Sequence, residues 1–571
     1  MEDLIKIAKG DQPADLLLRG ARIINVFTSE IHPANIAIAA EWIAGVGEDY
    51  TEGREVLDLE GLFLAPGLIN GHLHLESSLL SPSEYARLAL PRGTTTIVLD
   101  PHEIANVLGV SGIHALIDAS RDLPLDFFFM APSCVPATPL ETAGANLSVK
   151  EIAKLLSEPS VLGLGEMMNF PGVLRQDPEV IGKLKTARKV NKAIDGHAPL
   201  VSGKSLNAYI ASGIESDHES TRLEEAREKL HLGMWLMIRE GSAAKNLSDL
   251  LPAVTPQNSR RCLFVLDDLE AADLLRKGEL DYVLREATRL GLDPITAIQM
   301  ATLNPAERFG LKDRGAIAPG RRADILAVED LRGFQPLFVI KGGRVVAREG
   351  KTYPLQGRVW DPQAMQTVKI KPLEDSCFDL ALSGEKAWAI ELVPDQILTR
   401  KIGVIVNKDS RGLVQPDPGA DILKIAAVER HHASGRIGLG LIKGLELKRG
   451  AIATSVAHDS HNILVAGADD SDMKTAVREI EKMQGGFAVA EGGKILAGVP
   501  LPVAGLMSVQ SAETVAEEMG KLNQAAREIG ISLRNPFLTL SFLALPVIPE
   551  LRITDQGLVD VSEFRLISPE A

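Results

Sequence analysis

Strand-like and helix-like patterns of hydrophobic residues alternate along the middle of the chain, roughly residues 66–313. Eight short apolar runs typical of buried strands occur at residues 63–69, 94–99, 126–130, 161–164, 193–195, 213–216, 234–238 and 262–266. Helical patterns separate them, for example at residues 82–90, 104–119, 149–158, 178–190, 205–211 and 221–230. Strands that alternate with helices predict a parallel sheet. Eight such units in about 250 residues predict an α/β fold, a (β/α)8 TIM barrel, with a doubly wound open sheet as the alternative.

Shorter β patterns flank this middle part on both sides. They occupy residues 14–25, 36–46 and 55–64 before it, and residues 323–328 and 336–347 after it. We therefore expect residues 1–65 and 314–365 to form one small β-sandwich built from both flanks, with the barrel at residues 66–313. Residues 366–571 carry further apolar runs and two helical patterns, at 473–483 and 512–528, and predict a separate C-terminal α/β domain.

Composition narrows the class of protein. A chain of 571 residues with 45% hydrophobic residues predicts two to four well-packed domains. The net charge of −15 argues against a nucleic-acid partner, because binding to polyphosphate needs a basic surface. Three cysteines are too few for a disulfide framework. No apolar run approaches the roughly 18–20 residues of a membrane helix, and the N-terminus lacks a secretory pattern, so we expect a cytoplasmic protein without a membrane partner.

Candidate chemistry begins with the motif Gly71-His72-Leu73-His74 at the end of the first apolar run. Side chains at i and i+2 of a strand point to the same face. Two imidazoles held side by side supply half of a divalent-metal site, although two solvent-facing histidines on a loop would give the same motif.

The other predicted strands also end in groups that bind metals. Asp100, His102 and Glu103 follow the second strand, and the later strands end in Glu166, His197, His218 and the pair Asp267-Asp268. Five of the 12 histidines of the chain lie at these strand ends, where TIM barrels place their catalytic groups. Together these side chains offer enough nitrogen and oxygen ligands for two divalent ions that share one bridging carboxylate.

This arrangement resembles the amidohydrolase superfamily, whose members combine a metal-dependent barrel with a small β-sandwich made from both flanks. The resemblance implies His72, His74, His197, His218 and Asp267 as metal ligands. Many relatives carry a modified lysine after the fourth strand. Here Glu166, in Gly163-Leu164-Gly165-Glu166, would bridge the metals instead.

The chain resembles the bacterial adenine deaminases of this superfamily most closely. Matching stretches lie at residues 70–78, 93–107, 163–173, 195–199, 216–219, 238–242, 300–304, 456–462 and 485–489. The resemblance thus includes a C-terminal domain that most amidohydrolases lack. It implies hydrolysis of adenine to hypoxanthine and ammonia in purine salvage, with two divalent ions. We expect Mn²⁺, with Fe²⁺ or Zn²⁺ as alternatives, and a homodimer.

One departure from the family concerns the loop after the eighth strand, which reads Val265-Leu266-Asp267-Asp268-Leu269-Glu270-Ala271. The family usually has Thr before the aspartate pair and Pro a few residues after it. The expected metal carboxylate, Asp267, is retained, while the altered loop leaves substrate preference open. We expect Asp267 to act as both ligand and proton acceptor, because a ligating carboxylate lies within reach of the attacking water.

Four further residues are candidates for binding the purine ring, namely Asp100, His102, Glu103 and His461. For Asp100 and Glu103 the alternative is capping of the predicted helix at 104–119, since acids favour helix N-termini. His461 belongs to the polar cluster at residues 458–462, which lies between two apolar runs and predicts an exposed loop. That loop could bind a further metal, form a simple turn, or cover the barrel mouth.

Two other functions compete with adenine deamination. The first is another amidohydrolase reaction, on a different heterocycle or a cyclic amide. The second is a non-catalytic barrel that acts as a scaffold. The chain lacks the His-x-Glu and Pro-Cys-x-x-Cys signature of the deaminases that hold zinc with cysteines, so deamination would have to use the barrel site.

Overall fold

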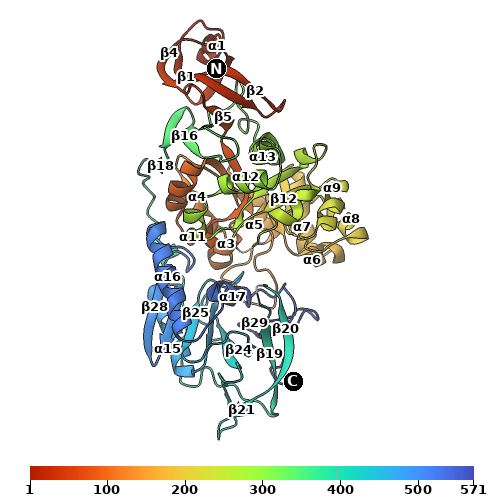
Figure 1. Ribbon diagram of the computed structural model, residues 1–571. Helices are drawn as coiled ribbons and strands as arrows, with labels where there is room; N and C mark the ends of the chain where they lie inside the picture. Colours follow the sequence, from red (N-terminus) through yellow and green to blue (C-terminus); the bar gives the residue numbers. More distant parts are fainter. Residues whose placement is uncertain (243, 395) are drawn as a thin grey trace.

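The computed structural model describes residues 1–242, 244–394 and 396–571. Figure 1 shows three parts stacked along one direction. An N-terminal β unit lies at one end, the strands and helices of the middle part follow, and the C-terminal domain lies at the other end. The middle part therefore contacts both other parts.

The N-terminal β unit is one nine-stranded sheet drawn from both flanks of the chain. Its order is β18-β17-β16-β15-β5-β1-β2-β3, with β4 beside β1. The strands are β1 (Ala14–Asn25), β2 (Glu30–Ala39), β3 (Trp42–Gly47), β4 (Gly53–Asp58), β5 (Phe63–Pro66), β15 (Ile325–Val328), β16 (Pro336–Lys341), β17 (Arg344–Arg348) and β18 (Lys351–Thr352). Antiparallel pairing of β15 with β5 joins the two flanks. We expect a β-sandwich from these strands, whereas their hydrogen bonds join them in one sheet.

The middle part contains eight parallel strands in two hydrogen-bonded groups. The first group contains β6 (Leu68–His74), β7 (Thr94–Leu99), β8 (Asp126–Ala131), β9 (Val161–Met167) and β10 (Ala193–Gly196), and the second contains β11 (Ser216–Asp217), β12 (Trp235–Arg239) and β13 (Cys262–Val265). β14 (Asp267–Asp268) follows β13 and pairs with β6, which links the groups on one side. On the other side Glu215 N donates to Ile194 O over 3.1 Å. The predicted α/β class with a parallel sheet is confirmed.

The first predicted strand of the middle part is wrong in extent. Residues Phe63–Pro66 belong to β5 of the N-terminal sheet, and β6 begins at Leu68. Gly67 separates the two strands, and a Cβ there would lie only 2.2 Å from Thr95 Oγ1, so this close approach requires glycine. As a result His72 and His74 lie within β6 instead of following a strand that ends at residue 69.

Helices cover the outside of this sheet. They are α2 (Pro82–Ala89), α3 (His102–Leu108), α4 (Val110–Ser120), α5 (Val149–Leu155), α6 (Phe170–Arg175), α7 (Pro178–Lys189), α8 (Gly203–Ala211), α9 (Leu223–His231), α10 (Leu247–Leu250), α11 (Ala271–Arg276), α12 (Leu280–Arg289), α13 (Pro294–Met300) and α14 (Leu303–Arg308). A short helix, α1 (Glu2–Ala8), precedes β1. The helix expected over residues 104–119 is broken at Gly109, whose φ of +62° ends α3 before α4 begins.

The C-terminal domain is built on an eight-stranded sheet in the order β20-β19-β24-β23-β26-β25-β27-β28. These strands are β19 (Lys386–Leu392), β20 (Thr399–Ile405), β23 (Leu423–Val428), β24 (Ile437–Lys443), β25 (Ala451–Thr454), β26 (Ile463–Gly467), β27 (Gly486–Glu491) and β28 (Lys494–Pro500). Helices α15 (Asp470–Met483) and α16 (Ala512–Glu528) match the two predicted helices, while α17 (Pro536–Phe542) lacked a clear sequence pattern. Small sheets contain β21 (Asn407–Lys408) with β22 (Val414–Gln415), and β29 (Leu551–Thr554), β30 (Gly557–Asp560) and β31 (Arg565–Ile567).

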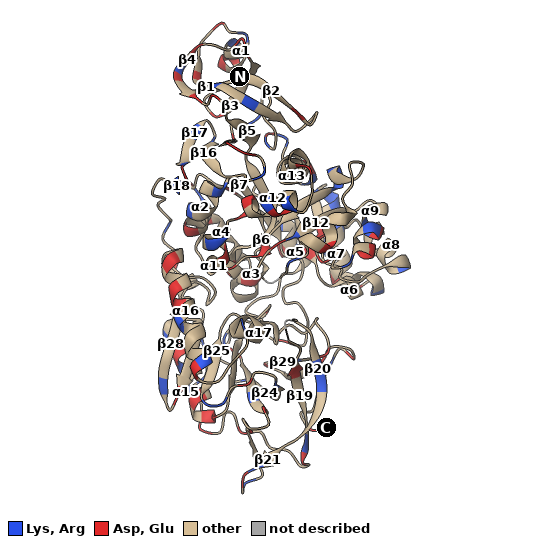
Figure 2. Ribbon diagram, viewed as in Figure 1, with Lys and Arg blue, Asp and Glu red and all other residues tan. Residues whose placement is uncertain are grey.

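Charged residues of both signs are interleaved on the outer helices, as Figure 2 shows for α9 and α16. The net charge of −15 is therefore spread over the surface together with basic side chains. Across the described ranges, every helix is too short or too polar to cross a bilayer.

Candidate metal centre and active site

The side chains expected to bind metal converge at one end of the parallel strands. His72 and His74 come from β6 and Glu166 from β9, while His197 and His218 directly follow β10 and β11. Asp267 begins β14. All of these side chains are buried except that of His197, which is partly exposed. They meet because the carboxyl ends of parallel strands lie at the same edge of a sheet.

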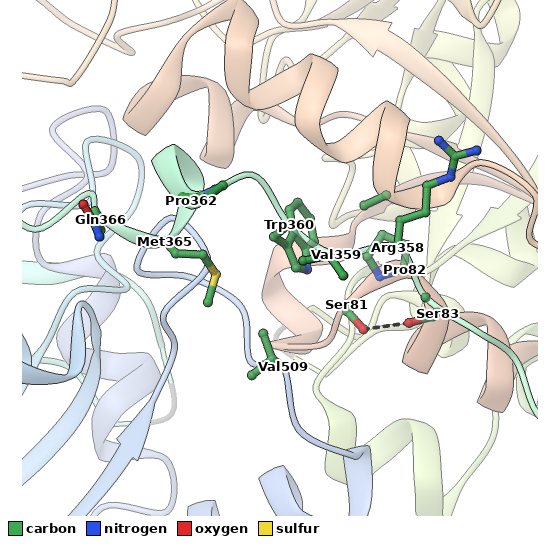
Figure 3. Close-up of a pocket in the computed structure, with 12 residues that line it drawn as sticks. Ser81, Pro82, Ser83, Arg358, Val359, Trp360, Pro362, Met365, Gln366 and Val509 are labelled. Atoms are coloured by element: carbon green, nitrogen blue, oxygen red, sulfur yellow. Dashed lines mark hydrogen bonds between the residues drawn. The ribbon is translucent and has the colours of Figure 1, made fainter.

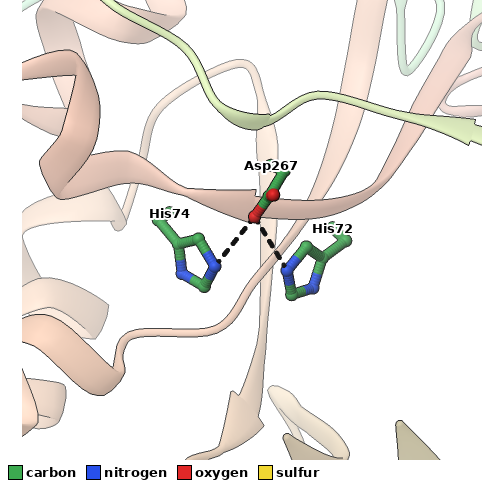
Figure 4. Close-up of side chains that lie close together, drawn as sticks. All are labelled: His72, His74 and Asp267. Atoms are coloured by element: carbon green, nitrogen blue, oxygen red, sulfur yellow. Dashed lines mark ion pairs between the residues drawn. The ribbon is translucent and has the colours of Figure 1, made fainter. Parts of the chain in front are cut away.

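Asp267 lies between the two histidines of β6 (Figure 4). Its Oδ1 is 3.4 Å from His72 Nε2 and 3.1 Å from His74 Nε2. Its Oδ2 accepts a hydrogen bond of 2.8 Å from Arg239. The neighbouring Asp268 turns away and accepts a 2.5 Å hydrogen bond from Ser77 Oγ. The backbone of Asp267 has a φ of +59°, so its side chain departs from regular strand alternation, and only the first aspartate of the pair faces the histidines.

Glu166 presents its two carboxylate oxygens to two different groups of imidazoles. Oε1 lies 3.3 Å from His74 Nε2 and 3.4 Å from His102 Nδ1. Oε2 lies 2.5 Å from His197 Nδ1 and 3.2 Å from His218 Nε2. Burial alone would raise the pKa of Glu166, but the imidazoles of His218 and His197 hold it well below its usual range. Glu166 is therefore an ionised carboxylate that faces both groups.

The backbone around Glu166 is fixed by Asp100. The backbone N–H of Glu166 donates to Asp100 Oδ2 over 2.9 Å. A Cβ on Gly165 would lie 2.2 Å from the same oxygen, so the approach of this carboxylate requires glycine in the strand. The carbonyl of Asp100 accepts from His74 Nδ1 at 2.9 Å. Asp100 thus holds both Glu166 and His74, while its Oδ1 is buried and has no hydrogen-bond partner among the described residues.

The donor set fits a divalent metal. Because His74 Nδ1 donates its proton to the Asp100 carbonyl, its Nε2 lone pair is free to ligate and faces Glu166 and Asp267. His72 Nε2 and His102 Nδ1 are buried and lack a hydrogen-bond partner among the described residues. The ligand atoms of His72, His74 and Asp267 lie within 4.8 Å of one another, as do those of His72, Glu166 and His218. Buried imidazoles and carboxylates at this spacing suit a metal cofactor.

Glu103 lies beside this centre, on the first turn of α3. Its Oε1 is 3.3 Å from Ser77 Oγ and 3.2 Å from His458 Nδ1. Its Oε2 is buried and is without a hydrogen-bond partner in the described parts of the chain. The N-cap residue of α3, Pro101, makes no side-chain cap, and the side chain that accepts from a first-turn N–H, that of Ile104, belongs to Glu76 and not to Asp100 or Glu103.

Three residues near the centre are not among the predicted site residues. Glu219 Oε1 lies 3.5 Å from His218 Nε2 and 3.8 Å from His197 Nδ1. Arg239 pairs with Glu219 and Asp267. Glu76 accepts from Ile104 N at 3.1 Å, and burial followed by the charge of Glu103 raises its pKa to about 7. Glu76 closes the motif that begins at Gly71, and Glu219 follows His218 directly, so their positions in the sequence were the available signals.

The C-terminal cluster at residues 458–462 was expected to be exposed, and this expectation is wrong. All five residues are buried in the loop between β25 and β26. The loop faces α3 and the preceding strand end, where His461 Nε2 lies 4.0 Å from Glu103 Oε2. Partners across the interface make this burial possible, as when Asn462 Nδ2 donates to Thr142 O over 2.8 Å. The loop therefore covers this end of the middle part.

A separate hollow of about 550 Å³ lies elsewhere on the protein (Figure 3). It is formed by the segment at residues 357–366, the start of α2 and Val509. Trp360 and Met365 supply apolar walls, and Ser81 and Ser83 form a hydrogen bond of 3.1 Å at its rim. Its walls come from other segments than the histidine cluster, so it is distinct from the candidate active site.

Comparisons with known proteins cover both the middle part and the C-terminal domain. Residues 63–346 match the family described as "Amidohydrolase family". Residues 396–565 match the family described as "Adenine deaminase C-terminal domain". Among solved structures, a beta-aspartyl dipeptidase from Fervidobacterium islandicum AW-1 aligns with a TM-score of 0.46 and 17% identity, over 60% of this chain and 99% of that one.

Full-length relatives are much more similar. An adenine deaminase of Dehalococcoides mccartyi strain 195 is 51% identical over 573 aligned residues, which cover 100% of this chain and 99% of the relative. An adenine deaminase of Desulfatibacillum aliphaticivorans is 50% identical and covers 99% of each chain. With its histidine and carboxylate cluster, its C-terminal domain and this identity over the whole length, the chain belongs to the adenine deaminase family of the amidohydrolases.

Proposed function

We propose that this protein hydrolyses adenine to hypoxanthine and ammonia at the end of the parallel strands where the histidines meet. Similarity to adenine deaminases over the whole chain supports the substrate. The observation that carries the proposal for the site is the placement of Glu166, because one carboxylate faces two separate groups of imidazoles. A shared carboxylate of this kind suits two dications held close together.

We further propose how the ligands divide between two ions. One ion would be held by His72, His74, Asp267 and Glu166 Oε1, and the other by His197, His218 and Glu166 Oε2. Mn²⁺ is the proposed metal, with Fe²⁺ or Zn²⁺ as alternatives, since mixed imidazole and carboxylate ligands suit all three. When bound, such ions supply the positive charge that lowers the pKa of water toward about 7.

The side chains of this protein would then carry the proton and hold the ring. Water adds to C6 of adenine, its proton passes to Asp267, and a proton is returned to the amine as it leaves as ammonia. Asp267 suits this role because Arg239 holds Oδ2 while Oδ1 faces the histidines. Glu103, His102 and His461 lie beside this cluster and would bind the purine together with Asp100, which also holds Glu166 and His74.

The architecture forms part of the same proposal. We propose that β6–β13 close as one (β/α)8 barrel, supported by the β14–β6 pairing and the bond between Glu215 and Ile194. The proposed domains are residues 1–65 with 314–365, residues 66–313, and residues 366–571. A homodimer and a cytoplasmic location stay predictions.

An assay of ammonia release tests the substrate. Metal-loaded protein would be offered adenine, other aminopurines, aminopyrimidines and cyclic amides at equal concentrations, with ring opening followed in parallel. We expect adenine to be turned over fastest, with one hypoxanthine formed per ammonia. Preference for another heterocycle would favour the alternative reaction and would point to the altered loop after Asp268.

The Glu103→Gln change tests the proposed substrate contact. We expect the metal content of the wild type and at least a tenfold lower rate on adenine, about the contribution of one charged hydrogen bond. Steady-state kinetics and metal analysis measure both quantities, and Glu329→Gln, at an exposed turn, is the matched control. Wild-type kcat and KM in Glu103→Gln would remove Glu103 from the substrate site.

A further inference from the structure

The loop at residues 458–461 brings two C-terminal imidazoles against a side chain of the middle part. His458 Nδ1 lies 3.2 Å from Glu103 Oε1, and His461 Nε2 lies 4.0 Å from Glu103 Oε2. The His458 ring stacks on Phe542 of α17, with a centroid distance of 4.7 Å and an interplanar angle of 22°. Packing within the C-terminal domain therefore sets the orientation of the imidazole that reaches Glu103.

Glu103, His458 and His461 have the spacing of a metal site, with ligand atoms within 4.8 Å of one another. The protonation of His461 argues against that role. Its Nδ1 lies 3.1 Å from the backbone N–H of Ala457, which is always a donor, so Nδ1 accepts and carries no proton. The neutral ring then has its proton on Nε2, which faces Glu103. His461 Nε2 is therefore a hydrogen-bond donor, whereas a metal would need a lone pair there.

The two oxygens of Glu103 have different surroundings. Oε1 faces Ser77 Oγ at 3.3 Å and His458 Nδ1 at 3.2 Å. Oε2 and His461 Nε2 are both buried, and neither has a hydrogen-bond partner in the described part of the protein. Leaving such groups unpaired is costly, so a donor and an acceptor side by side indicate a place where a ligand binds.

We infer that the C-terminal domain completes the substrate site: His458 positions Glu103 so that its Oε2, next to the N–H of His461, offers an acceptor and a donor to one edge of the substrate. The matching ligand presents an N–H beside an unprotonated ring nitrogen, as the edges of a purine base do. His458 acts through Glu103 and is a positioning residue. The inference rests on the proposed role of Glu103 in binding adenine.

Two amide variants of His458 separate positioning from general packing. Asn places its N–H₂ near the position of Nδ1, whereas Gln places it near Nε2, away from Glu103. We expect His458→Gln to raise KM for adenine at least about tenfold with unchanged metal content, and His458→Asn to restore most of the affinity. His432→Gln is the control, since His432 lies at the same domain interface and bonds the Ala143 carbonyl at 3.1 Å.

A double-mutant cycle identifies the residue through which His458 acts. If His458 works through Glu103, Glu103→Gln combined with His458→Gln should be no worse than Glu103→Gln alone. Multiplied losses would overturn the inference, as would equal kinetics for the Asn and Gln variants of His458. An unaffected Glu103→Gln enzyme would instead remove the proposed role of Glu103, so the two failures are distinguishable. Thermal unfolding and metal analysis of each variant confirm that folded, loaded enzyme is compared.

Discussion

Replacing Glu166 with Gln is expected to abolish nearly all turnover of adenine and to lower the bound metal by at least one equivalent per chain. The carboxylate faces His74 with one oxygen and His197 and His218 with the other. An amide keeps the size but loses the charge that holds two dications near each other. Mutation of a residue that only supports a metal ligand lowers metal affinity or activity about 10–100-fold. We therefore expect Glu166→Gln to lower the rate of adenine turnover more than about 100-fold.

The measurement combines metal analysis with adenine kinetics on the purified Glu166→Gln protein. The matched control is Glu215→Gln, whose side chain pairs with Arg308 at 2.6 Å and is half-exposed, outside the histidine cluster. The control should keep its metal and turnover. A Glu166→Gln protein with full activity and the wild-type metal content would sink the bridging assignment.

The second large effect is expected at the aspartate pair after the eighth strand. Asp267→Asn should abolish turnover, whereas Asp268→Asn should leave a measurable rate. Asp267 faces both β6 histidines, and His72 and His74 hold its pKa well below the usual range although burial opposes this. Asp268 instead accepts a hydrogen bond from Ser77. Loss of the Asp267 charge removes both a ligand and the proposed proton acceptor.

Each variant would be assayed with the same metal loading, so that a change in kcat is separated from a change in metal affinity. The two variants remove one charge each from neighbouring positions, which makes them controls for each other. Wild-type turnover by Asp267→Asn together with no turnover by Asp268→Asn would show that the roles of the two residues are reversed.

The strands and their metal-binding ends were predictable because both leave local patterns. The apolar runs predicted at residues 94–99 and 161–164 begin at the first residues of β7 and β9. Glu166 lies two residues after the second run. The spacing of His72 and His74 placed both on one face of a strand. These features depend on neighbours within a few residues, which a single sequence contains.

Features that depend on distant partners were not predictable in the same way. The cluster at 458–462 is as polar as an exposed loop, and its burial depends on α3, more than 300 positions earlier in the chain. Arg239 likewise forms ion pairs with Glu219 and Asp267 and not with its sequence neighbour Glu240, because the neighbouring strands bring those two carboxylates close to it. The hydrophobic periodicity of a single sequence carries no information about such contacts between distant residues.

The most direct test of the account is a titration of metal-stripped protein with Mn²⁺, Fe²⁺ or Zn²⁺, with bound metal and adenine turnover measured on the same samples. The account predicts negligible conversion of adenine without metal, and hypoxanthine and ammonia in equal amounts as activity rises to its maximum at two equivalents per chain. Full adenine turnover by the metal-free protein, or no adenine turnover with two equivalents of any of the three metals bound, would contradict it.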